Sequence, residues 1–512
     1  MKNREESKAS RQMNRLLTFF NGIKAFIKKV NVKMEGKYSP SLLALAVTAI
    51  TALVVSSILF LPGGLGVAGD GSTDDIMRSA GIYYKDKEPD RIYNNYFVKT
   101  YSTVASGNDV PGKTVNSQVF LIRLAKGLDQ VLTRDNDFDI RFLGFLYLLL
   151  YLPAVYLIVR QVCQRVRQFS EGVIIAAAGL FIFSDIGYVT YFNSFYPEAI
   201  WFITMLYVAG ASMSFQTERN AHWDFYSLLL FLVSGVILVG SRRQCAVIGF
   251  ILAVYVIRLI FVRKSFLWGV SCVAAAFLLS IFSILNIFLF PSDFTETSKF
   301  HAMTRGVLFG SSNPAQTLEE FGIDPSYELL TDASAYDYIP FVKAGDDSLY
   351  HGFMDQYTTS DVAVYYLRHP GSLLGMLDVS IRAGMDIRRS SCGNYEITAG
   401  LPKKARSLFW SGWSTFKMTS APRTIGYLIL LIGAVFFLFY KGYSIRPPKD
   451  RRNTIFLDLL MMVLGVLLSQ SLVVIIHSGD AEMVQRMFLV GISLDIMTYC
   501  VFAELQHRIK VV

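Results

Sequence analysis

The sequence is short of charge and of paired cysteines. Charged residues make up 17% of its 512 positions, against about 25% in soluble domains. None of the five cysteines stands in a C-x-x-C pair, so we expect neither a disulfide framework nor a zinc site. P-loop, GxGxxG, HExxH and GxSxG motifs are missing from any credible context, and no internal repeat supports an inverted-repeat transporter.

Long apolar runs account for the low charge and for a mean hydropathy of +0.39. A helix needs about 20 residues to cross a hydrocarbon core of about 30 Å. Backbone amides in lipid must bond within their own segment, so these runs favour helices; a barrel would alternate in segments of about ten residues. We predict an all-α polytopic membrane protein with about ten spans, at roughly 40–62, 139–160, 171–191, 198–214, 224–240, 244–262, 266–290, 423–441, 454–477 and 486–505.

Basic residues indicate the orientation of these spans. Ten Lys and Arg against three Glu precede the first span, and the other basic clusters are "RQVCQRVRQ", "FVRK", "YKGYSIRPPKDRRN" and the tail "QHRIKVV". All of them fall on one face of a ten-span topology. Cytoplasmic loops are rich in Lys and Arg, so we expect both termini in the cytoplasm of a cell-membrane protein. The net charge of +9 is largely this bias, and no nucleic-acid partner is expected.

The spans divide the chain into four parts. Residues 1–39 form a basic segment that we expect to rest on membrane lipid. Residues 40–290 hold the first seven spans and a first outer loop, 63–138. An extracytoplasmic domain, 291–422, is followed by the last three spans and a short tail in 423–512. Because both large insertions face outward, we expect the function on the outer face.

Polar side chains collect at four points on that face. The first is the stretch "AGDGSTDDIMRSAGIYY", which places Asp70, Asp74, Asp75 and Arg78 just beyond the first span. Asp, Gly and Ser favour turns, so a solvated loop is the alternative for any one acid. Asp70 stands between glycines, where a backbone can approach a ligand closely.

The second and third points follow the third and fifth spans. The stretch "YFNSFYPEA" carries Asn193, Tyr196 and Glu198. An aromatic belt and a helix-start acid would also explain Tyr196 and Glu198, but not Asn193, so we expect Asn193 to contact substrate. The stretch "GSRRQ" puts Arg242 and Arg243 in a short outer loop, against the positive-inside tendency. A guanidinium binds phosphate through two hydrogen bonds, so a lipid-linked phosphate is a good partner. A headgroup anchor or a pair with an outer-loop acid is the alternative.

The fourth point is the stretch "HSGDAEMVQRMF" between the last two spans. Asp480, Glu482 and Arg486 cluster there. Ionisable groups against lipid are costly without mutual pairing or a substrate, although a loop of mixed charge would also account for them. We expect Asp185 and Asp458, which lie within predicted spans, to be packing partners near helix ends.

Carboxylates and arginines at an outer membrane surface suit sugar transfer from a lipid-phosphate donor. An acceptor hydroxyl is a poor nucleophile, so a positioned carboxylate would act as base. Arginines would stabilise the charge that grows on the departing polyprenyl phosphate. No nucleotide site is needed, because the sugar arrives already activated on lipid.

This layout resembles the GT-C class of integral-membrane glycosyltransferases. These have a large first outer loop with acidic residues near its start and a second acidic site in the next outer loop. More specifically, the resemblance to bacterial membrane hexose transferases of cell-surface glycan assembly rests on "GDGSTDDIMRSAGIYY", "YFNSFYPE", "KFHAMTRGVLFGSSNPAQTLEEFGID", "YLRHPGSLL" and "SGDAEMVQRMFLVGISLD". It covers most of the chain. It implies a GT-C-like helical bundle, a polyprenyl-phosphate sugar donor, and a glycan or lipid-linked acceptor.

The resemblance also implies roles for the acids. Asp70 would be the catalytic base, with Asp74 or Asp75 in reserve, and Glu198 would bind the acceptor or orient the base. Displacement with a single base would invert the anomeric centre. The metal-binding DxD pair of some class members is absent in strict form, so a divalent metal stays open and no cofactor is certain.

The cations take complementary roles in this resemblance. Arg242 and Arg243 would face the lipid phosphate, while His301 and Arg305 of "SKFHAMTR" would add charge near the sugar or phosphate. Three other functions stay open. A flippase or transporter would share the arginines without needing the large outer domain. A polysaccharide polymerase or ligase would use arginine and histidine in that domain, and a receptor-like protein would leave the charge clusters unexplained.

Overall fold

The computed structural model describes residues 18, 21–22, 25, 28–34, 39–61, 64–106, 110–166, 168–215, 221–289, 294–335, 347–441, 443 and 452–508. Each of the ten predicted runs lies on apolar helix. Within the described residues, seven helices are long and apolar enough to cross a membrane, or eight if a bent pair counts as one span. The seven spans contain α2 (Pro40–Phe60), α6 (Arg141–Cys163), α10 (Ala221–Val239), α11 (Ala246–Leu259), α12 (Phe266–Leu289), α20 (Arg452–Ser478) and α22 (Phe488–Arg508). The predicted all-α, multi-pass class is therefore confirmed.

Three of the runs depart from a plain span. Helices α7 (Phe169–Phe183) and α8 (Ile186–Val189, continued by the 3-10 turn η1, Thr190–Asn193) form the pair bent by 44°. At the bend the carboxylate of Asp185 accepts the N–H groups of Gly187 and Ser414 at 2.8 and 3.0 Å, as expected of a packing partner at a helix end. Helices α9 (Glu198–Met213) and α19 (Ile425–Phe439) have 16 and 15 residues, fewer than the about 20 that a span needs.

The centre of the bundle is formed by α9 and α22. Every residue of α9 except Tyr207 is buried, as expected of a helix that is apolar on all sides. Helices α6 and α10 pack against α9, while α19 and α20 pack against α22. In contrast, α12 exposes large apolar side chains such as Phe266 (89%) and Phe288 (79%), as expected of a helix that faces lipid.

The first insertion is a small mixed layer between α2 and α6. Its strands β2 (Thr100–Ser102) and β3 (Asp137–Asp139) pair antiparallel, with Tyr101 opposite Phe138. Its other elements are β1 (Leu65–Val67), α3 (Asp74–Ser79), α4 (Pro89–Ile92) and α5 (Ser117–Thr133).

The second insertion lies between α12 and α19 and is joined to the first by strand pairing. Strand β4 (Cys392–Tyr395) pairs antiparallel with β1, with a register irregularity between Gly66 and Val67. Helix α17 (Pro370–Gly384) of the second insertion packs against α20 and α22. The remaining elements are α13 (Glu296–His301), the π-helix η4 (Ala302–Leu308), α14 (Pro314–Glu320), α15 (Asp347–Gly352), α16 (Thr359–Arg368), α18 (Gly412–Thr419) and the short 3-10 helices η5 (Pro325–Leu330), η6 (Met354–Gln356) and η7 (Ile397–Ala399).

A buried ionic cluster fixes α18 against the bundle. The carboxylate of Asp495, on α22, accepts hydrogen bonds from Lys417 Nζ at 2.8 Å, from Trp413 Nε1 at 2.7 Å and from the hydroxyl of Tyr188. Lys417 and Asp495 are only 1% and 2% exposed. The second insertion is thus tied to the middle of a membrane helix.

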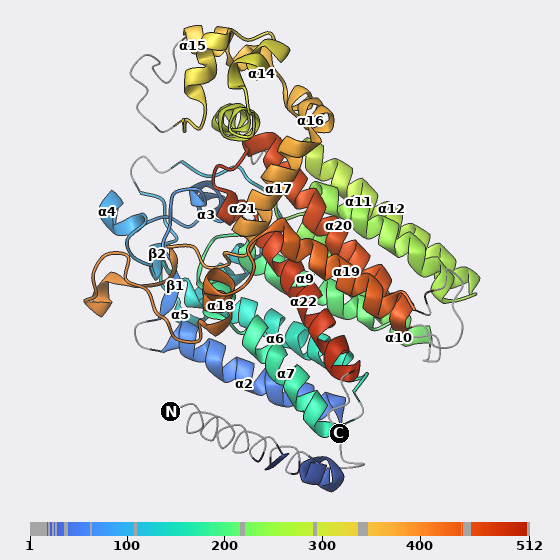
Figure 1. The fold of residues 1–512 in the computed structure, drawn as a ribbon. Helices are drawn as coiled ribbons and strands as arrows, with labels where there is room; N and C mark the ends of the chain where they lie inside the picture. Colours follow the sequence, from blue (N-terminus) through green and yellow to red (C-terminus); the bar gives the residue numbers. More distant parts are fainter. Residues whose placement is uncertain are drawn as a thin grey trace, which may run out of the picture.

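The two insertions gather at one end of the bundle. Figure 1 shows α3, α4 and β1 of the first insertion, and α14 to α16 of the second, at the end away from the carboxyl terminus. The opposite end carries ion pairs between helices. Arg165 lies 3.0 Å from Glu504, and Asp458, as expected of a packing partner, lies 3.3 Å from Arg258. Any site built from both insertions must therefore lie at the end where they meet.

Candidate active site

Asp70 follows β1 on a loop that distant parts of the chain hold in place. Its backbone N–H donates to the hydroxyl of Tyr196 at 3.0 Å. Its carboxylate accepts the N–H and hydroxyl of Ser72 at 2.9 and 2.6 Å and lies 3.6 Å from Arg389. Burial acts to raise the pKa of Asp70, but the bonds with Ser72 and Tyr196 and the charge of Arg389 outweigh it, so the pKa lies below its ordinary value. Asp70 is therefore an ionised and oriented carboxylate at neutral pH.

The other two acids of this stretch bond within the first insertion. Asp74 and Asp75 begin α3, where negative charge complements the helix dipole. Asp74 accepts the hydroxyls of Tyr93 and Tyr84 at 2.6 and 3.4 Å, and Asp75 accepts the hydroxyl of Thr114. The structure thus pairs both acids with hydroxyl groups of the first insertion, and neither of these hydrogen bonds involves Asp70.

Asn193 also has partners within the fold. Its buried side-chain amide donates to the carbonyls of Leu59 and Leu65 at 3.1 and 2.9 Å. These bonds join η1 to the end of α2 and to β1. The amide nitrogen of Asn193 is therefore occupied by backbone, while its amide oxygen has no hydrogen-bond partner among the described residues.

Glu198 is a buried carboxylate at the start of α9. It follows Pro197 and is 1% exposed. Neither of its carboxylate oxygens has a hydrogen-bond partner among the described residues, and the cations Arg389 and Arg242 act on it electrostatically. About nine-tenths or more of buried polar groups in proteins are hydrogen-bonded. An unsatisfied buried carboxylate therefore marks a place where a ligand or water would bind.

A polar cavity of about 250 Å³ lies at Glu198. It draws side chains from the first insertion, from α9, from the turn between α10 and α11, from the segment before α13, and from the connection between α20 and α22. They are Ser72, Pro197, Glu198, Trp201, Arg242, Gln244, Thr295, Glu482, Gln485 and Arg486. The second, third and fourth polar points of the sequence thus each contribute charge to one cavity, and the first contributes Ser72, the hydrogen-bond partner of Asp70.

The turn that carries Arg242 is fixed by bonds to its backbone and to the residue before it. Trp201 Nε1 donates to the hydroxyl of Ser241 at 2.8 Å, Asn116 donates to the Ser241 carbonyl at 3.0 Å, and Asn286 donates to the Arg242 carbonyl at 3.2 Å. This support comes from three different helices or their caps. Arg242 therefore enters the cavity from a rigid turn.

Two other predicted cations lie outside the set of residues that line the cavity. Arg243, next in the chain, acts electrostatically on His477. Arg78 lies in the last turn of α3, where its charge acts electrostatically on Tyr93. The adjacent positions of Arg242 and Arg243 in the sequence gave no means of telling which of the two lines the cavity.

The connection between α20 and α22 has an unusual backbone. Glu482 has a φ of 52° and Gly479 a φ of 57°, and left-handed conformations are uncommon for residues other than glycine. The guanidinium of Arg486 lies 3.1 Å from the Glu482 carboxylate and 4.8 Å from the ring centre of Phe294. Backbone strain of this kind clusters at functional sites, because the surrounding structure must hold it in place.

His301 and Arg305, in the second insertion, make contacts within the fold. Arg305 donates to both oxygens of Asp480, at 2.7 and 3.2 Å, and lies 3.0 Å from Asp332. The imidazole Nε2 of His301 accepts the N–H of Ala335 at 2.9 Å. Burial lowers the pKa of His301. Arg305 and Asp480 therefore join the second insertion to the α20–α22 connection, whereas His301 bonds within the insertion. None of the three is among the residues that line the cavity.

Arg389 is the charged residue that the sequence analysis did not single out. Its guanidinium lies 4.5 Å from the ring centre of Tyr196 and 5.7 Å from that of Tyr191. Its Nε and Nη2 groups are buried and have no hydrogen-bond partner among the described residues. Arg389 acts electrostatically on the carboxylates of both Asp70 and Glu198. A second Arg pair, in "DIRRSSCGNY", was the available signal.

The described residues contain no group of three or more His, Cys, Asp and Glu side chains that could hold a metal ion. Two carboxylates of the candidate site have other partners, since Asp70 accepts hydrogen bonds from Ser72 and Glu482 pairs with Arg486. The arrangement can hold an anionic ligand and can take up a proton.

The helices and their arrangement define a multi-pass membrane protein. Within that class, the chain belongs to the family described as the YfdI N-terminal transmembrane domain, whose model matches residues 24–512. Among curated proteins there is no significant match.

Two solved structures of an archaeal oligosaccharyltransferase are similar to this chain. One is AglB from Archaeoglobus fulgidus in complex with an inhibitory peptide and a dolichol-phosphate, at 10% identity and a TM-score of 0.35, covering 89% of this chain and 50% of that one. The other is the Archaeoglobus fulgidus enzyme tethered to an acceptor peptide, at 10% identity and a TM-score of 0.34, covering 90% and 49%. The chain spans about half the length of these proteins.

Proposed function

We propose that the chain is a GT-C-type membrane glycosyltransferase. It transfers a hexose from a polyprenyl-phosphate donor to a cell-surface glycan acceptor on the extracytoplasmic face. The observation that carries this proposal is the cavity in which Arg242, Arg486 and the unsatisfied Glu198 meet, at the end of the bundle where both insertions lie. Such a cavity suits an anionic group together with sugar hydroxyls.

In the proposed reaction Asp70 is the base. It is ionised and oriented, and it accepts the proton of the acceptor hydroxyl. The acceptor oxygen forms a bond to the anomeric carbon from the side opposite the phosphate. The bond between that carbon and the phosphate oxygen breaks, and its electron pair leaves with the polyprenyl phosphate. The anomeric centre is inverted.

The cations stabilise the charge that develops on the leaving group. Arg242 and Arg486 line the cavity, where a guanidinium can make paired hydrogen bonds to phosphate oxygens. Glu198 accepts hydrogen bonds from hydroxyls of the sugar or acceptor, which would satisfy its two open oxygens. Arg389 helps to orient Asp70 through the ion pair between them.

The test is sugar transfer by the full chain in lipid vesicles that contain a polyprenyl-phosphate hexose and a lipid-linked glycan. Asp70→Asn removes the base and should lower the rate by about 10²- to 10⁴-fold without loss of membrane insertion. Asp86→Asn is the matched control, because Asp86 is a half-buried acid of the same insertion that pairs with Arg91.

Two results would contradict the proposal. Full activity of Asp70→Asn would remove Asp70 from the reaction. Movement of the lipid-linked glycan across the vesicle membrane, with no new glycosidic linkage, would indicate a transporter instead.

A further inference from the structure

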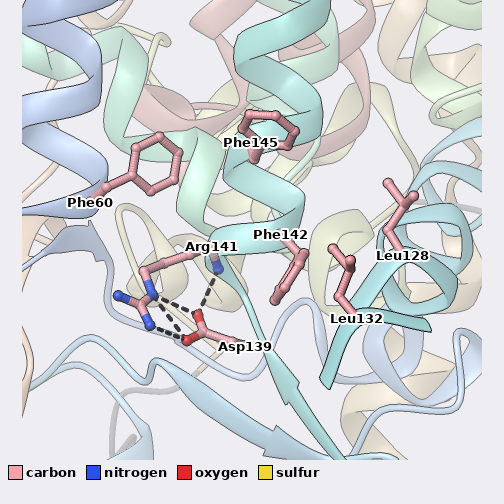
Figure 2. A pocket seen from close by; sticks show the side chains of 7 residues that line it. All are labelled: Phe60, Leu128, Leu132, Asp139, Arg141, Phe142 and Phe145. Carbon is pink, nitrogen blue, oxygen red and sulfur yellow. Dashed lines mark hydrogen bonds and ion pairs between the residues drawn. The ribbon is translucent and has the colours of Figure 1, made fainter. Parts of the chain in front are cut away.

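A second cavity, apolar and of about 390 Å³, lies where α2 ends and α6 begins. Figure 2 shows its walls: Phe60 from the last turn of α2, Phe142 and Phe145 from α6, and Leu128 and Leu132 from α5. Its volume falls within the range of about 300–1,000 Å³ that is common for small-molecule sites. Because α2 and α6 are both candidate spans, the cavity lies at a membrane boundary.

Helix α5 extends this apolar surface along its length. One face of α5 is buried against the protein through Val119, Ile122 and Ala125. The other face exposes large apolar side chains at helical spacing, and they are Phe120 (67%), Leu124 (45%), Leu128 (40%), Val131 (73%) and Leu132 (71%). Helices that lie in the plane of a membrane interface have this pattern, because the apolar face enters the acyl region.

A pair of opposite charges stands at the cavity. Arg141, the first residue of α6, donates to both carboxylate oxygens of Asp139, from Nε at 3.0 and 2.9 Å and from Nη2 at 2.6 Å. Figure 2 shows this pair beside the aromatic rings of the cavity. The side chain of Arg141 is 41% exposed and that of Asp139 is 17% exposed, so both keep a surface for an outside group.

We propose that this cavity binds one zwitterionic phospholipid, a phosphatidylethanolamine. An acyl chain fills the space between Phe60, Phe145 and Leu132. The lipid phosphate binds Arg141, and the ammonium group binds the neighbouring carboxylate of Asp139. The site is separate from the polar cavity at Glu198 and shares no lining residue with it.

Charge decides between a zwitterionic occupant and anionic lipids. Asp139 cancels the charge of Arg141, so the pair offers one contact for an anion and one for a cation. A polyprenyl phosphate or a phosphatidylglycerol carries negative charge without an ammonium group, and Asp139 would repel it. Only a headgroup with both charges is complementary to both side chains.

Native mass spectrometry of the detergent-purified full chain tests the headgroup. The probes are phosphatidylethanolamine and phosphatidylglycerol with the same acyl chains, and a polyprenyl phosphate. Wild type should retain the ethanolamine lipid about tenfold more than either anionic lipid, because a charge-assisted hydrogen bond is lost with each. Asp139→Asn leaves an unpaired cation and should shift the preference to phosphatidylglycerol.

Fluorescence quenching tests the acyl chain independently. Leu132→Trp, in nanodiscs whose lipids carry brominated acyl chains, should add quenched emission over the wild-type background. Leu329→Trp is the matched control, because Leu329 is 82% exposed on η5 of the second insertion.

The proposal is overturned by equal quenching of the two tryptophan variants, by equal retention of all three lipids, or by preferred retention of the polyprenyl phosphate. Neither measurement depends on sugar transfer, so its outcome is distinct from that of the proposed enzymatic function.

Discussion

Two buried carboxylates in apolar helices, Asp495 and Glu198, have opposite surroundings. They are 2% and 1% exposed. Asp495 accepts hydrogen bonds from Lys417, Trp413 and Tyr188, whereas Glu198 has no hydrogen-bond partner for either oxygen among the described residues. Equal burial therefore does not imply an equal role. Asp495 is matched within the fold, while Glu198 lines a cavity and is left for a ligand.

The difference has an energetic side. A buried ion pair is costly to break, because the remaining charge stays in a low-dielectric region without compensation. A buried carboxylate that is unmatched from the start already carries this cost in the folded state. Removing the charge of Asp495 should therefore lower the free energy of unfolding, whereas removing the charge of Glu198 should not.

The largest expected effect is on the matched carboxylate. Lys417→Met should lower the free energy of unfolding by about 3–5 kcal/mol, because Asp495 is left buried and unpaired. The measurement is thermal unfolding of the purified chain. Lys417→Met combined with Asp495→Leu should recover most of the loss, and if the double variant were as unstable as the single one, the charge would not be its cause.

The next effect separates stability from activity. Glu198→Gln should keep or raise the melting temperature and lower sugar transfer on the order of 10- to 100-fold, because a hydrogen bond to a charged group is lost. Asp495→Asn is the matched variant and should lower the melting temperature, since Lys417 then lacks its ion-pair partner. A similar loss of stability in both variants would remove the distinction between the two carboxylates.

A third effect extends the comparison to cations. Arg242→Ala with Arg243→Ala should weaken donor binding by about 1.5–3 kcal/mol, the value of a hydrogen bond to a charged group. Arg305→Ala should instead lower stability and leave donor affinity unchanged, because Arg305 is bonded to Asp480. Donor affinity of both variants is measured by equilibrium binding of a fluorescent polyprenyl phosphate. Unchanged affinity in the variant with both Arg242 and Arg243 replaced would contradict phosphate contact.

The smallest effect is a pH dependence at His301. Burial lowers its pKa in the folded state, so the unfolded chain binds the proton more tightly. The stabilising contribution is complete above the unfolded pKa of about 6.5 and is lost as the pH falls through the folded value. The melting temperature should fall by a few degrees on acidification. His301→Gln should show a smaller fall, and an identical acid-side loss in this variant would assign the effect to other groups.

Composition and periodicity were enough to predict the class of the fold. Runs of apolar residues in lipid can only be helical, and all ten predicted runs lie on helices. Helix length was harder to predict, because the helical parts of the runs at α9 and α19 prove too short for a plain span. At the bend, Asp185 accepts a hydrogen bond from Ser414, more than two hundred residues away, and the local sequence pattern does not contain this contact.

Part of the candidate site could also be predicted from the sequence, and part could not. Unusual polar residues near membrane ends pointed to Glu198, Arg242 and Arg486, which the structure brings to one cavity. Asn193 looked equally unusual, but its partners are backbone carbonyls that only the folded chain supplies. Arg389 was missed because its neighbours Asp70 and Tyr196 come from distant segments. The roles of all these residues stay predictions.

The short helix α9 has one more consequence. Its 16 residues extend about 24 Å at about 1.5 Å per residue, less than a hydrocarbon core of about 30 Å. A helix in contact with lipid would have to thin the bilayer or tilt its neighbours to meet that mismatch. Because protein surrounds α9 on nearly every side, its amino end can stop short of the headgroup level while its free N–H groups stay shielded from hydrocarbon. The protein can in this way seat an acid deeper than the bilayer alone would tolerate.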